Sequence, residues 1–274
     1  MVSGLERKKL INLLTSKSKV YRRQIVEMVY RAGSGHPGGS LSSIDIINAL
    51  YNYKLSVSPK EPKSPERDRF ILSKGHDCPA LYAVLADKGF FPKAELDNFR
   101  KINHLLEGHT SIKIPGVDMS GGSLGQGLSF AIGIAFARKI DKMNFKIYVM
   151  LGDGEVQEGE VWEAAMTASH YALDITAILD KNGIQNDWFV KETKSIEPIE
   201  KKWQAFGWKT IRINGHDFDE ILDALDEAEK IKGPVIIIAD TIKGKGVSFM
   251  ENNPDFHGKA PNDEEYKKAM EELR

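Results

Sequence analysis

The feature that most constrains the fold of this chain is a set of five short apolar runs, separated by stretches with helical periodicity. The runs are apolar on both faces, which is typical of strands in a parallel sheet that helices cover on both sides. We therefore predict an α/β fold with a parallel sheet flanked by helices on both faces. The predicted strands are residues 70–72, 146–151, 175–179, 210–213 and 235–239.

Helical periodicity occupies much of the remaining chain. Two stretches are instead predicted to be connections: 58–68, which contains three prolines, and 105–122, a long glycine-rich loop of the kind that tends to be functional. No internal repeat or domain boundary is evident, so residues 1–274 are predicted to form a single domain. The predicted helices are residues 5–31, 42–53, 79–88, 123–138, 160–171, 199–206, 218–231 and 264–273.

Composition excludes several classes of protein. The 38 lysines and arginines nearly balance the 39 aspartates and glutamates, so a broad nucleic-acid-binding face is not expected. The single Cys78 excludes an intrachain disulfide and a multi-thiolate metal site, and it fits a reducing compartment. The apolar run 235–239 is far shorter than the roughly 20 residues that a membrane helix needs. We therefore expect a cytoplasmic protein with neither a nucleic-acid nor a membrane partner.

Polar turns follow two consecutive predicted strands. Asp153, between Gly152 and Gly154, follows one strand, and Asn182 follows the next, 182 − 153 = 29 residues later. The carboxyl ends of parallel strands meet at one edge of a sheet, where ligands bind. Aspartate and asparagine oxygens suit Mg²⁺ or Ca²⁺, and glycines let the backbone approach a phosphate. Such residues also form ordinary hydrogen-bonded turns, and that alternative stays open at this point.

These turns are part of a longer series of motifs that resembles transketolases. The series runs from about residue 21 to 259 and keeps the order seen in that family. It covers only the N-terminal, diphosphate-binding part, so the chain resembles the N-terminal subunit of a split transketolase, a thiamine-diphosphate enzyme. The motifs are SGHPGGS at 34–40, SKGH at 73–76, GSLGQGL at 122–128, GDG at 152–154, DKNGI at 180–184, TIKGKG at 241–246 and FHG at 256–258.

The resemblance implies an activity, a cofactor and a partner. It implies transfer of a two-carbon ketol group from a ketose phosphate to an aldose phosphate through a thiamine-diphosphate carbanion, as in the pentose phosphate pathway. The implied metal is Mg²⁺, with Ca²⁺ and Mn²⁺ as alternatives. The pyrimidine-binding and C-terminal domains are expected on a partner chain, in an α₂β₂ heterotetramer, and this chain alone is expected to be inactive.

The resemblance also assigns roles to residues. Asp153 and Asn182 correspond to side-chain metal ligands, and Ile184 corresponds to a ligand through its carbonyl. Glu158 corresponds to a residue that reaches a glutamate of the neighbouring chain, and it is grouped with the catalytic residues. The other implied catalytic residues are His36, His76, His109 and His257. The implied cofactor-binding residues are His76, Gly122, Ser123, Leu124, Gly152, Asp153, Gly154, Glu158, Asn182, Ile184, Lys243 and His257.

Several histidines suit this chemistry because imidazole titrates near neutrality and can donate or accept a proton. The family usually has proline after the histidine at position 109, whereas this chain has Thr110. Ser123 and Gln126 also have the spacing of a helix capping box, and both interpretations of Ser123 can hold together. Three further histidines match no catalytic motif and are assigned no chemistry: His104, His170 and His216.

Other functions remain as alternatives. Within the same enzyme class, these are a subunit of a sulfosugar or dihydroxyacetone-forming transketolase, half of a 1-deoxyxylulose-phosphate synthase, or, with a poorer fit, a 2-oxoacid dehydrogenase α subunit. The alternative outside this enzyme class is a non-catalytic phosphate-binding module that kept the fold. The presence of His36, Asp153 and Asn182 together favours an enzyme over that module.

Overall fold

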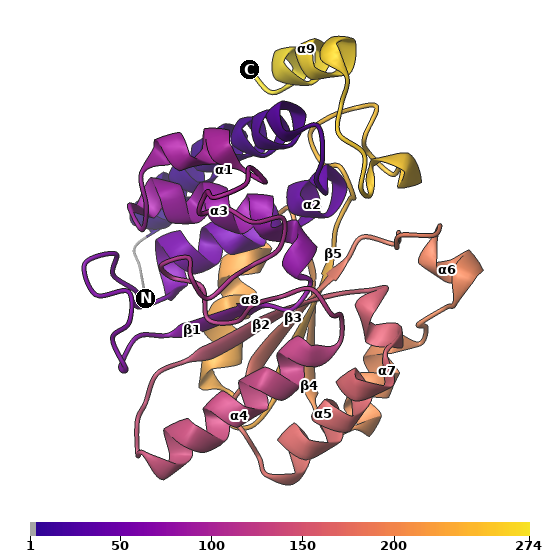
Figure 1. Cartoon of the computed structure of the whole chain (residues 1–274). Coiled ribbons are helices and arrows are strands. Elements are labelled where there is room, and N and C mark those ends of the chain that lie inside the picture. Colours follow the sequence, from indigo (N-terminus) through magenta and orange to yellow (C-terminus); the bar gives the residue numbers. More distant parts are fainter. Residues whose placement is uncertain (1–3) are drawn as a thin grey trace.

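The computed structural model describes residues 4–274 and contains a five-stranded sheet in which every pair of neighbouring strands is parallel (Figure 1). The strands lie in the order β1-β2-β3-β5-β4. The parallel sheet that the apolar runs predicted is therefore confirmed, and its strand ends differ from the predicted ones by at most two residues. The strands are β1 (Arg69–Leu72), β2 (Ile147–Gly152), β3 (Thr176–Lys181), β4 (Lys209–Asn214) and β5 (Val235–Asp240).

Helices cover both faces of this sheet, as predicted (Figure 1). The short helix α6 (Val190–Thr193) was not predicted. The C-terminal helix α9 (Asp263–Glu272) packs on α1 (Gly4–Ala32). None of the helices within residues 4–274 is long and apolar enough to cross a membrane. One face carries α1 (Gly4–Ala32), α2 (Pro37–Ala49), α3 (Cys78–Lys88) and α8 (Phe218–Lys230), and the other carries α4 (Gln126–Ile140), α5 (Gly159–His170) and α7 (Ile199–Ala205).

Alternate residues of β1, β2, β3 and β5 enter two separate cores, which explains why these four strands are apolar on both faces. The edge strand β4 differs from the prediction, because Ile211 and Ile213 face one core whereas Thr210 and Arg212 lie on its other face. In β2, Tyr148 and Met150 belong to the core beneath α1, α2, α3 and α8. Val149 and Leu151 belong to the core beneath α4, α5 and α7. A polar residue at these central positions would be buried whichever face it took, so the sequence there is restricted to apolar side chains.

The strand order creates a switch point at the carboxyl edge of the sheet. The chain passes from β1 to β2 to β3 in one direction, but it returns from β4 to β5, which lies against β3. Ligands of such sheets bind outside the carboxyl ends of the strands at this reversal. Asp180 pairs with Gly152 of β2 and with Ala239 of β5, so the three strands end at the same level.

Two predicted helix starts are wrong. The helix α2 begins at Pro37 and not at 42, and it continues after Ala49 into a π-helical turn, Leu50–Lys54. Proline is favoured at the first helical position because its missing N–H has no partner to lose there. Gly39 in the first turn of α2 is needed for close packing, because a Cβ atom there would lie 2.3 Å from Asp77 Oδ1.

The helix α4 begins at Gln126 and not at 123, and the predicted capping box is not formed. The N-cap residue is Gly125, whose φ of 88° is unfavourable for a residue with a Cβ atom, and it has no side-chain cap. Ser73, at the end of β1, takes over this role, because its Oγ accepts a hydrogen bond from Gly127 N at 3.1 Å. A distant strand therefore supplies the cap that the local sequence suggested for Ser123.

We expect Trp203→Ala to lower the free energy of unfolding by about 3–5 kcal/mol, because a large cavity would open in the core beneath α7. Trp203 is fully buried, and its ring centroid lies 5.1 Å from that of Trp162 and 4.9 Å from that of Trp208. Urea denaturation measures the change. The half-exposed Trp188 is the matched control, and Trp188→Ala is expected to change stability by no more than about 0.5 kcal/mol. Equal losses in both variants would contradict this assignment of the core.

Candidate active site

A cavity of about 410 Å³ opens at the carboxyl edge of the sheet. Its walls come from the start of α2, from the loops that follow β1, β2, β3 and β5, and from the long loop before α4. Of the site residues predicted from sequence, Ser123 alone does not line it. Those that do are His36, His76, His109, Gly122, Leu124, Gly152, Asp153, Gly154, Glu158, Asn182, Ile184, Lys243 and His257.

The four histidines predicted to be catalytic meet in this cavity. His36 is the N-cap residue of α2, and its ring centroid lies 5.0 Å from that of His76. The centroids of His109 and His257 lie 6.0 Å and 5.6 Å from that of His36. Nδ1 of His36 is buried and has no hydrogen-bond partner within the described chain. Four imidazoles from separate loops are thus grouped around one space.

These imidazoles are neutral at pH 7. Burial lowers the pKa of each below its ordinary value of 6.5. The pKa of His257 falls to about 3, because burial acts together with the nearby charge of Lys243. A neutral imidazole has one donor and one acceptor nitrogen, so this cluster can hold hydroxyl groups or move a proton between them.

Thr110 holds the loop that carries His109, at the position where the family pattern has proline. Gly121 N donates a hydrogen bond of 2.9 Å to Thr110 Oγ1 and one of the same length to Thr110 O. Tyr82 Oη donates to the carbonyl of His109 at 2.8 Å. Hydrogen bonds therefore restrain this loop without the fixed φ angle of a proline.

Asp153 is a buried carboxylate that lines the cavity. It is 2% exposed, and it accepts hydrogen bonds from Gly154 N at 2.8 Å and Gly183 N at 2.5 Å. No residue in the described range 4–274 forms an ion pair with it. Burial, followed by the charge of Asp180, raises the pKa of Asp153 to about 6. A nearby cation would relieve this unfavourable burial of charge.

Asn182 and Ile184 add two neutral oxygens beside Asp153. Asn182 Nδ2 donates to Ser42 Oγ at 3.3 Å and to Asp180 Oδ2 at 3.2 Å, which fixes the amide orientation. Among the described residues, Asn182 Oδ1 accepts only from Ile184 N, at 3.1 Å, and so keeps a free lone pair. A carboxylate, an amide oxygen and a backbone carbonyl form a donor set that suits Mg²⁺, Ca²⁺ or Mn²⁺. The predicted metal ligands therefore fit a divalent cation.

Lys243 connects the oxygen ligands to the histidines. Its Nζ donates to Ile184 O at 2.9 Å and lies 2.6 Å from His257 Nδ1. The side chain is 2% exposed, and burial lowers the pKa of Lys243 to about 8 although Asp77 opposes the shift. An ammonium group in this place favours an anionic ligand.

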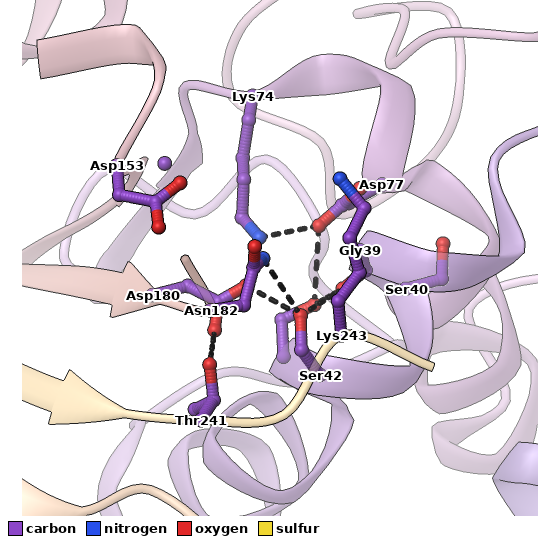
Figure 2. A network of polar contacts seen from close by, with 12 residues as sticks. Gly39, Ser40, Ser42, Lys74, Asp77, Asp153, Asp180, Asn182, Thr241 and Lys243 are labelled. Carbon is purple, nitrogen blue, oxygen red and sulfur yellow. Dashed lines mark hydrogen bonds and ion pairs between the residues drawn. The ribbon is translucent and has the colours of Figure 1, made fainter. Parts of the chain in front are cut away.

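A second buried lysine, Lys74, compensates the carboxylates behind the cavity (Figure 2). It extends from the end of β1 between Asp77, at 2.5 Å, and Asp180, with which it also forms an ion pair. Ser42 Oγ donates to Asp180 at 2.6 Å, and Thr241 Oγ1 donates to its other oxygen. Burial would raise the pKa of Asp180, but Lys74 and these donors hold it below its ordinary value.

The sequence pattern did not single out Glu155, which organises the edge of the site. Its carboxylate accepts from Gly152 N and from Gly125 N, each at 2.9 Å, and from Ser73 Oγ. This one side chain joins the turn after β2, the start of α4 and the end of β1. An acidic residue directly after Gly-Asp-Gly was the available signal. Burial raises the pKa of Glu155, and the hydrogen bond from Ser73 opposes the shift.

The remaining predicted residues lie at the rim. Gly122, Leu124 and Glu158 line the cavity and lie toward solvent, whereas the exposed Ser123 lies outside the lining. Glu158 is the N-cap residue of α5 and forms no cap bond with its side chain. A Cβ atom on Gly125 would lie 3.0 Å from Glu158 Cβ, so the loop passes close to the start of α5.

The three histidines that were assigned no chemistry do not line this cavity. His104 and His170 lie at the surface. His216 is largely buried, and its Nδ1 lies 2.8 Å from Asp45 Oδ2.

Oxygen ligands at the switch point of a parallel sheet, next to glycines that permit close approach of the backbone, define the class of this protein. It is an α/β protein whose site suits a phosphate ligand held through a divalent cation. The histidines beside that site distinguish it from a simple phosphate-binding turn.

Comparisons with known proteins give the family. Residues 15–273 match the family model described as transketolase, thiamine diphosphate binding domain. The chain is 40% identical to one of the subunits of the apulose-4-phosphate transketolase of Phocaeicola vulgatus, over 96% of this chain and 94% of that protein. It is 43% identical to the 6-deoxy-6-sulfo-D-fructose transketolase subunit SqwG of Clostridium sp. (strain MSTE9), over 95% and 96%. The chain belongs to the transketolase family and corresponds to its thiamine diphosphate binding domain.

A solved structure agrees with this assignment. The crystal structure of the transketolase from Campylobacter jejuni matches with a TM-score of 0.91 and 35% sequence identity. The match covers 96% of this chain but 43% of that chain, so this protein spans less than half of the solved transketolase. The likeness confirms the thiamine-diphosphate-binding α/β fold that the motifs predicted.

We expect Lys74→Met to lower the free energy of unfolding by about 3–5 kcal/mol, because it leaves Asp77 and Asp180 buried without a compensating charge. Urea denaturation measures the loss. Lys201→Met, on the exposed side of α7, is the matched control and is expected to change stability by no more than about 0.5 kcal/mol. A Lys74→Met variant as stable as the wild type would show that the two carboxylates do not need this lysine.

We also expect acid to destabilise the fold through His257. The unfolded chain binds a proton on this residue near pH 6.5, whereas the folded chain does so only near pH 3. The unfolded state therefore binds more protons below pH 6.5, and this contribution to stability falls as the pH falls toward 3. Between pH 7.5 and 5.5, His257→Asn should lose about 1 kcal/mol less stability than the wild type. Denaturant titrations at both pH values test this, and equal losses would argue against a buried neutral His257.

Proposed function

We propose that this chain is the N-terminal, diphosphate-binding subunit of a split transketolase. With a C-terminal partner chain, it would transfer a two-carbon ketol group from a ketose phosphate to an aldose phosphate. The observation that carries the proposal is the convergence of three oxygen ligands and four neutral histidines on one cavity. The oxygens suit a metal–diphosphate anchor, and the histidines suit a substrate with several hydroxyl groups.

Asp153, Asn182 and the carbonyl of Ile184 are proposed to hold Mg²⁺, with Ca²⁺ and Mn²⁺ as substitutes. The ion would balance the charge of Asp153 and of the cofactor diphosphate. The glycines at 152 and 154 would let that diphosphate come close to the backbone of this turn. Lys243 would add a positive charge from the β5 side of the cavity.

Thiamine diphosphate, when bound, supplies the carbanion that carries the two-carbon unit. The residues proposed to lie along it are His76, Gly122, Ser123, Leu124, Glu158 and His257. Of these, Glu158 is exposed at the rim, where a neighbouring chain can reach it. Ser123 is proposed with them although it lies outside the cavity lining, because it sits between two lining residues.

The histidines are proposed to act on the sugar hydroxyls and the reacting carbonyl oxygen. A neutral imidazole donates a hydrogen bond to a developing negative charge and can accept a proton from a hydroxyl group. His36 has a buried, unpartnered Nδ1 within the described chain and is proposed, with His257, to lie nearest the reacting oxygen. His76 lies beside them, and His109 is proposed to contact the first hydroxyls of the donor.

The partner is proposed to carry the pyrimidine-binding and C-terminal domains in an α₂β₂ heterotetramer. Two observations support this. The relatives from Phocaeicola vulgatus and Clostridium are themselves named as transketolase subunits, and both are covered almost completely by this chain. The transketolase chain from Campylobacter jejuni is more than twice as long as the part matched here. We thus propose that residues 1–274 form a single domain of a two-chain enzyme.

The substrates are proposed to be sugar phosphates, as in the cytoplasmic pentose phosphate pathway. A second candidate is a related sugar, because one relative is named for apulose 4-phosphate and another for 6-deoxy-6-sulfo-D-fructose. These candidates share the ketol group that the four histidines would contact and differ at the other end of the molecule. A panel of donors with phosphate or sulfonate at the far end separates them.

We expect Asp153→Asn to weaken the binding of thiamine diphosphate with MgCl₂ by at least about 100-fold, because it removes the only charged ligand among the proposed metal-binding residues. Calorimetric titration is made with this chain alone and with a candidate C-terminal chain from the same genome. Addition of that chain should create ketol transfer, and the Asp153→Asn complex should lack it.

Asp187→Asn is the matched control, because Asp187 is an exposed acidic residue that lines the same cavity. This variant should bind the cofactor like the wild type. Ketol transfer at full rate by this chain alone would contradict the two-chain proposal. Absence of cofactor binding in the folded mixture would favour the non-catalytic phosphate-binding module.

A further inference from the structure

Lys243 reaches the cavity from a segment, residues 241–246, that lies outside any helix or strand. Gly244 in this segment has a φ of 80°, and a Cβ atom there would lie 2.2 Å from Met250 O. The segment therefore turns tightly and depends on tertiary hydrogen bonds for its shape. The position of Lys243 affects both Ile184 and His257, because its ammonium group contacts both.

A buried cluster of three charged or polar side chains contacts this segment from other elements. Arg22 of α1 donates to both carboxylate oxygens of Asp45 of α2, at 3.0 Å and 2.6 Å. His216, in the turn before α8, lies 2.8 Å from Asp45 Oδ2 through its Nδ1. Burial would raise the pKa of Asp45, but Arg22 and His216 hold it at about 2. We call these residues the Arg22–Asp45–His216 cluster.

The cluster holds the backbone on both sides of Lys243. Ile242 N donates to His216 Nε2 at 2.9 Å, and Arg22 Nε donates to Lys245 O at 3.0 Å. Because a backbone N–H can only donate, His216 Nε2 must accept, and the ring proton lies on Nδ1 and is donated to Asp45. Asp45 thus fixes the tautomer with which His216 holds the segment.

We propose that Arg22, Asp45 and His216 are positioning residues that set the place of Lys243, and through it the affinity for the cofactor diphosphate. This inference rests on the proposed function, in which Lys243 contacts that diphosphate. Net stability does not explain the cluster well, since buried ion pairs can often be replaced by apolar side chains without loss. Partners that orient a ligand-binding residue, by contrast, commonly change affinity about 10–100-fold.

Other bonds also hold the ends of this segment: Thr241 N donates to Lys181 O at 3.1 Å, and Gly246 N donates to Glu251 Oε1 at 2.9 Å. Within the described chain, however, only the cluster bonds to Ile242 N and Lys245 O. Gly244 N donates to Gly38 O and Asn252 N donates to Lys243 O, each at 2.9 Å. These bonds restrain the peptide at Lys243 itself, whereas the cluster restrains the residue before it and the second residue after it. Loss of His216 is therefore expected to increase the mobility of the backbone at Ile242. The hydrogen bond from Gly244 N to Gly38 O would still hold the segment against α2.

Amide hydrogen exchange on the full chain without cofactor tests the first step. His216→Ala should increase exchange in residues 241–246, because Ile242 N loses its acceptor. Asn48→Ala is the matched control, since Asn48 is also a buried polar residue of α2, bonded to Leu14 O and Ser18 Oγ. It should lower stability without a local increase at 241–246. Unchanged exchange in this segment of His216→Ala would overturn the proposal.

A double-mutant cycle tests the second step in the assembled two-chain enzyme, with thiamine diphosphate and MgCl₂ as the titrant. His216→Ala should weaken binding about tenfold, and Lys243→Met should weaken it at least as much. The double variant should bind no worse than Lys243→Met alone, because His216 acts through Lys243. His216→Gln, which keeps one donor and one acceptor, should restore most of the affinity.

Losses that add in the double variant would overturn the proposal, because His216 would then act independently of Lys243. An unchanged affinity in Lys243→Met would also overturn it and would remove Lys243 from the cofactor site. The proposed function itself is decided separately by Asp153→Asn, so the two failures are distinguishable. Lys19 is exposed on α1 and lines a surface cavity together with Arg22, so Lys19→Ala is a nearby control and should leave affinity and exchange unaltered.

Discussion

Lys74 is a charged side chain buried at the carboxyl edge of the sheet, and the arrangement of the site depends on it. Its ammonium group compensates Asp77 at the start of α3 and Asp180 at the end of β3. A buried carboxylate is costly unless a charge and hydrogen bonds satisfy it, so these elements can meet only with the lysine between them. For the same reason, the hydroxyl groups of Ser42 in α2 and of Thr241 after β5 donate hydrogen bonds to Asp180 (Figure 2). One charge thus joins both sides of the switch point.

The two aspartates at the ends of the neighbouring strands β2 and β3, Asp153 and Asp180, differ in how their charge is compensated. Asp180 receives Lys74 and two hydroxyl donors, so its negative charge is balanced within the protein. Asp153 accepts from two backbone N–H groups and forms no ion pair with any residue of the range 4–274. Since Asp180 also accepts from the amide nitrogen of Asn182, it turns the amide oxygen of Asn182 away from itself and toward Ile184 N. The internal ion pair therefore determines which oxygens remain for a cation.

The sequence predicted the parts of this arrangement that follow from strand direction. Asp153 and Asn182 follow consecutive parallel strands, and their meeting at one edge needed no knowledge of packing. The position of β5 beside β3 was not predictable, because a list of strands does not contain their order. Ser123 was assigned a cap that Ser73, the residue directly after β1, provides instead, and no local pattern records such a contact. Glu155 was missed because its three partners become neighbours only after folding.

Lys243 then completes the charge balance from the other side of the cavity. Its ammonium group has three donors, of which one is used by Ile184 O and one faces His257 Nδ1, so the third has no partner in the described chain. Burial weakens its charged form, whereas an anionic diphosphate would strengthen it. Asp153, which has no ion-pair partner in the described chain, thus favours a positive group of a ligand. Lys243, whose charged form is disfavoured by burial, favours a negative one. A metal ion bound to a diphosphate satisfies both residues, since it brings a positive centre to the aspartate and negative oxygens to the lysine.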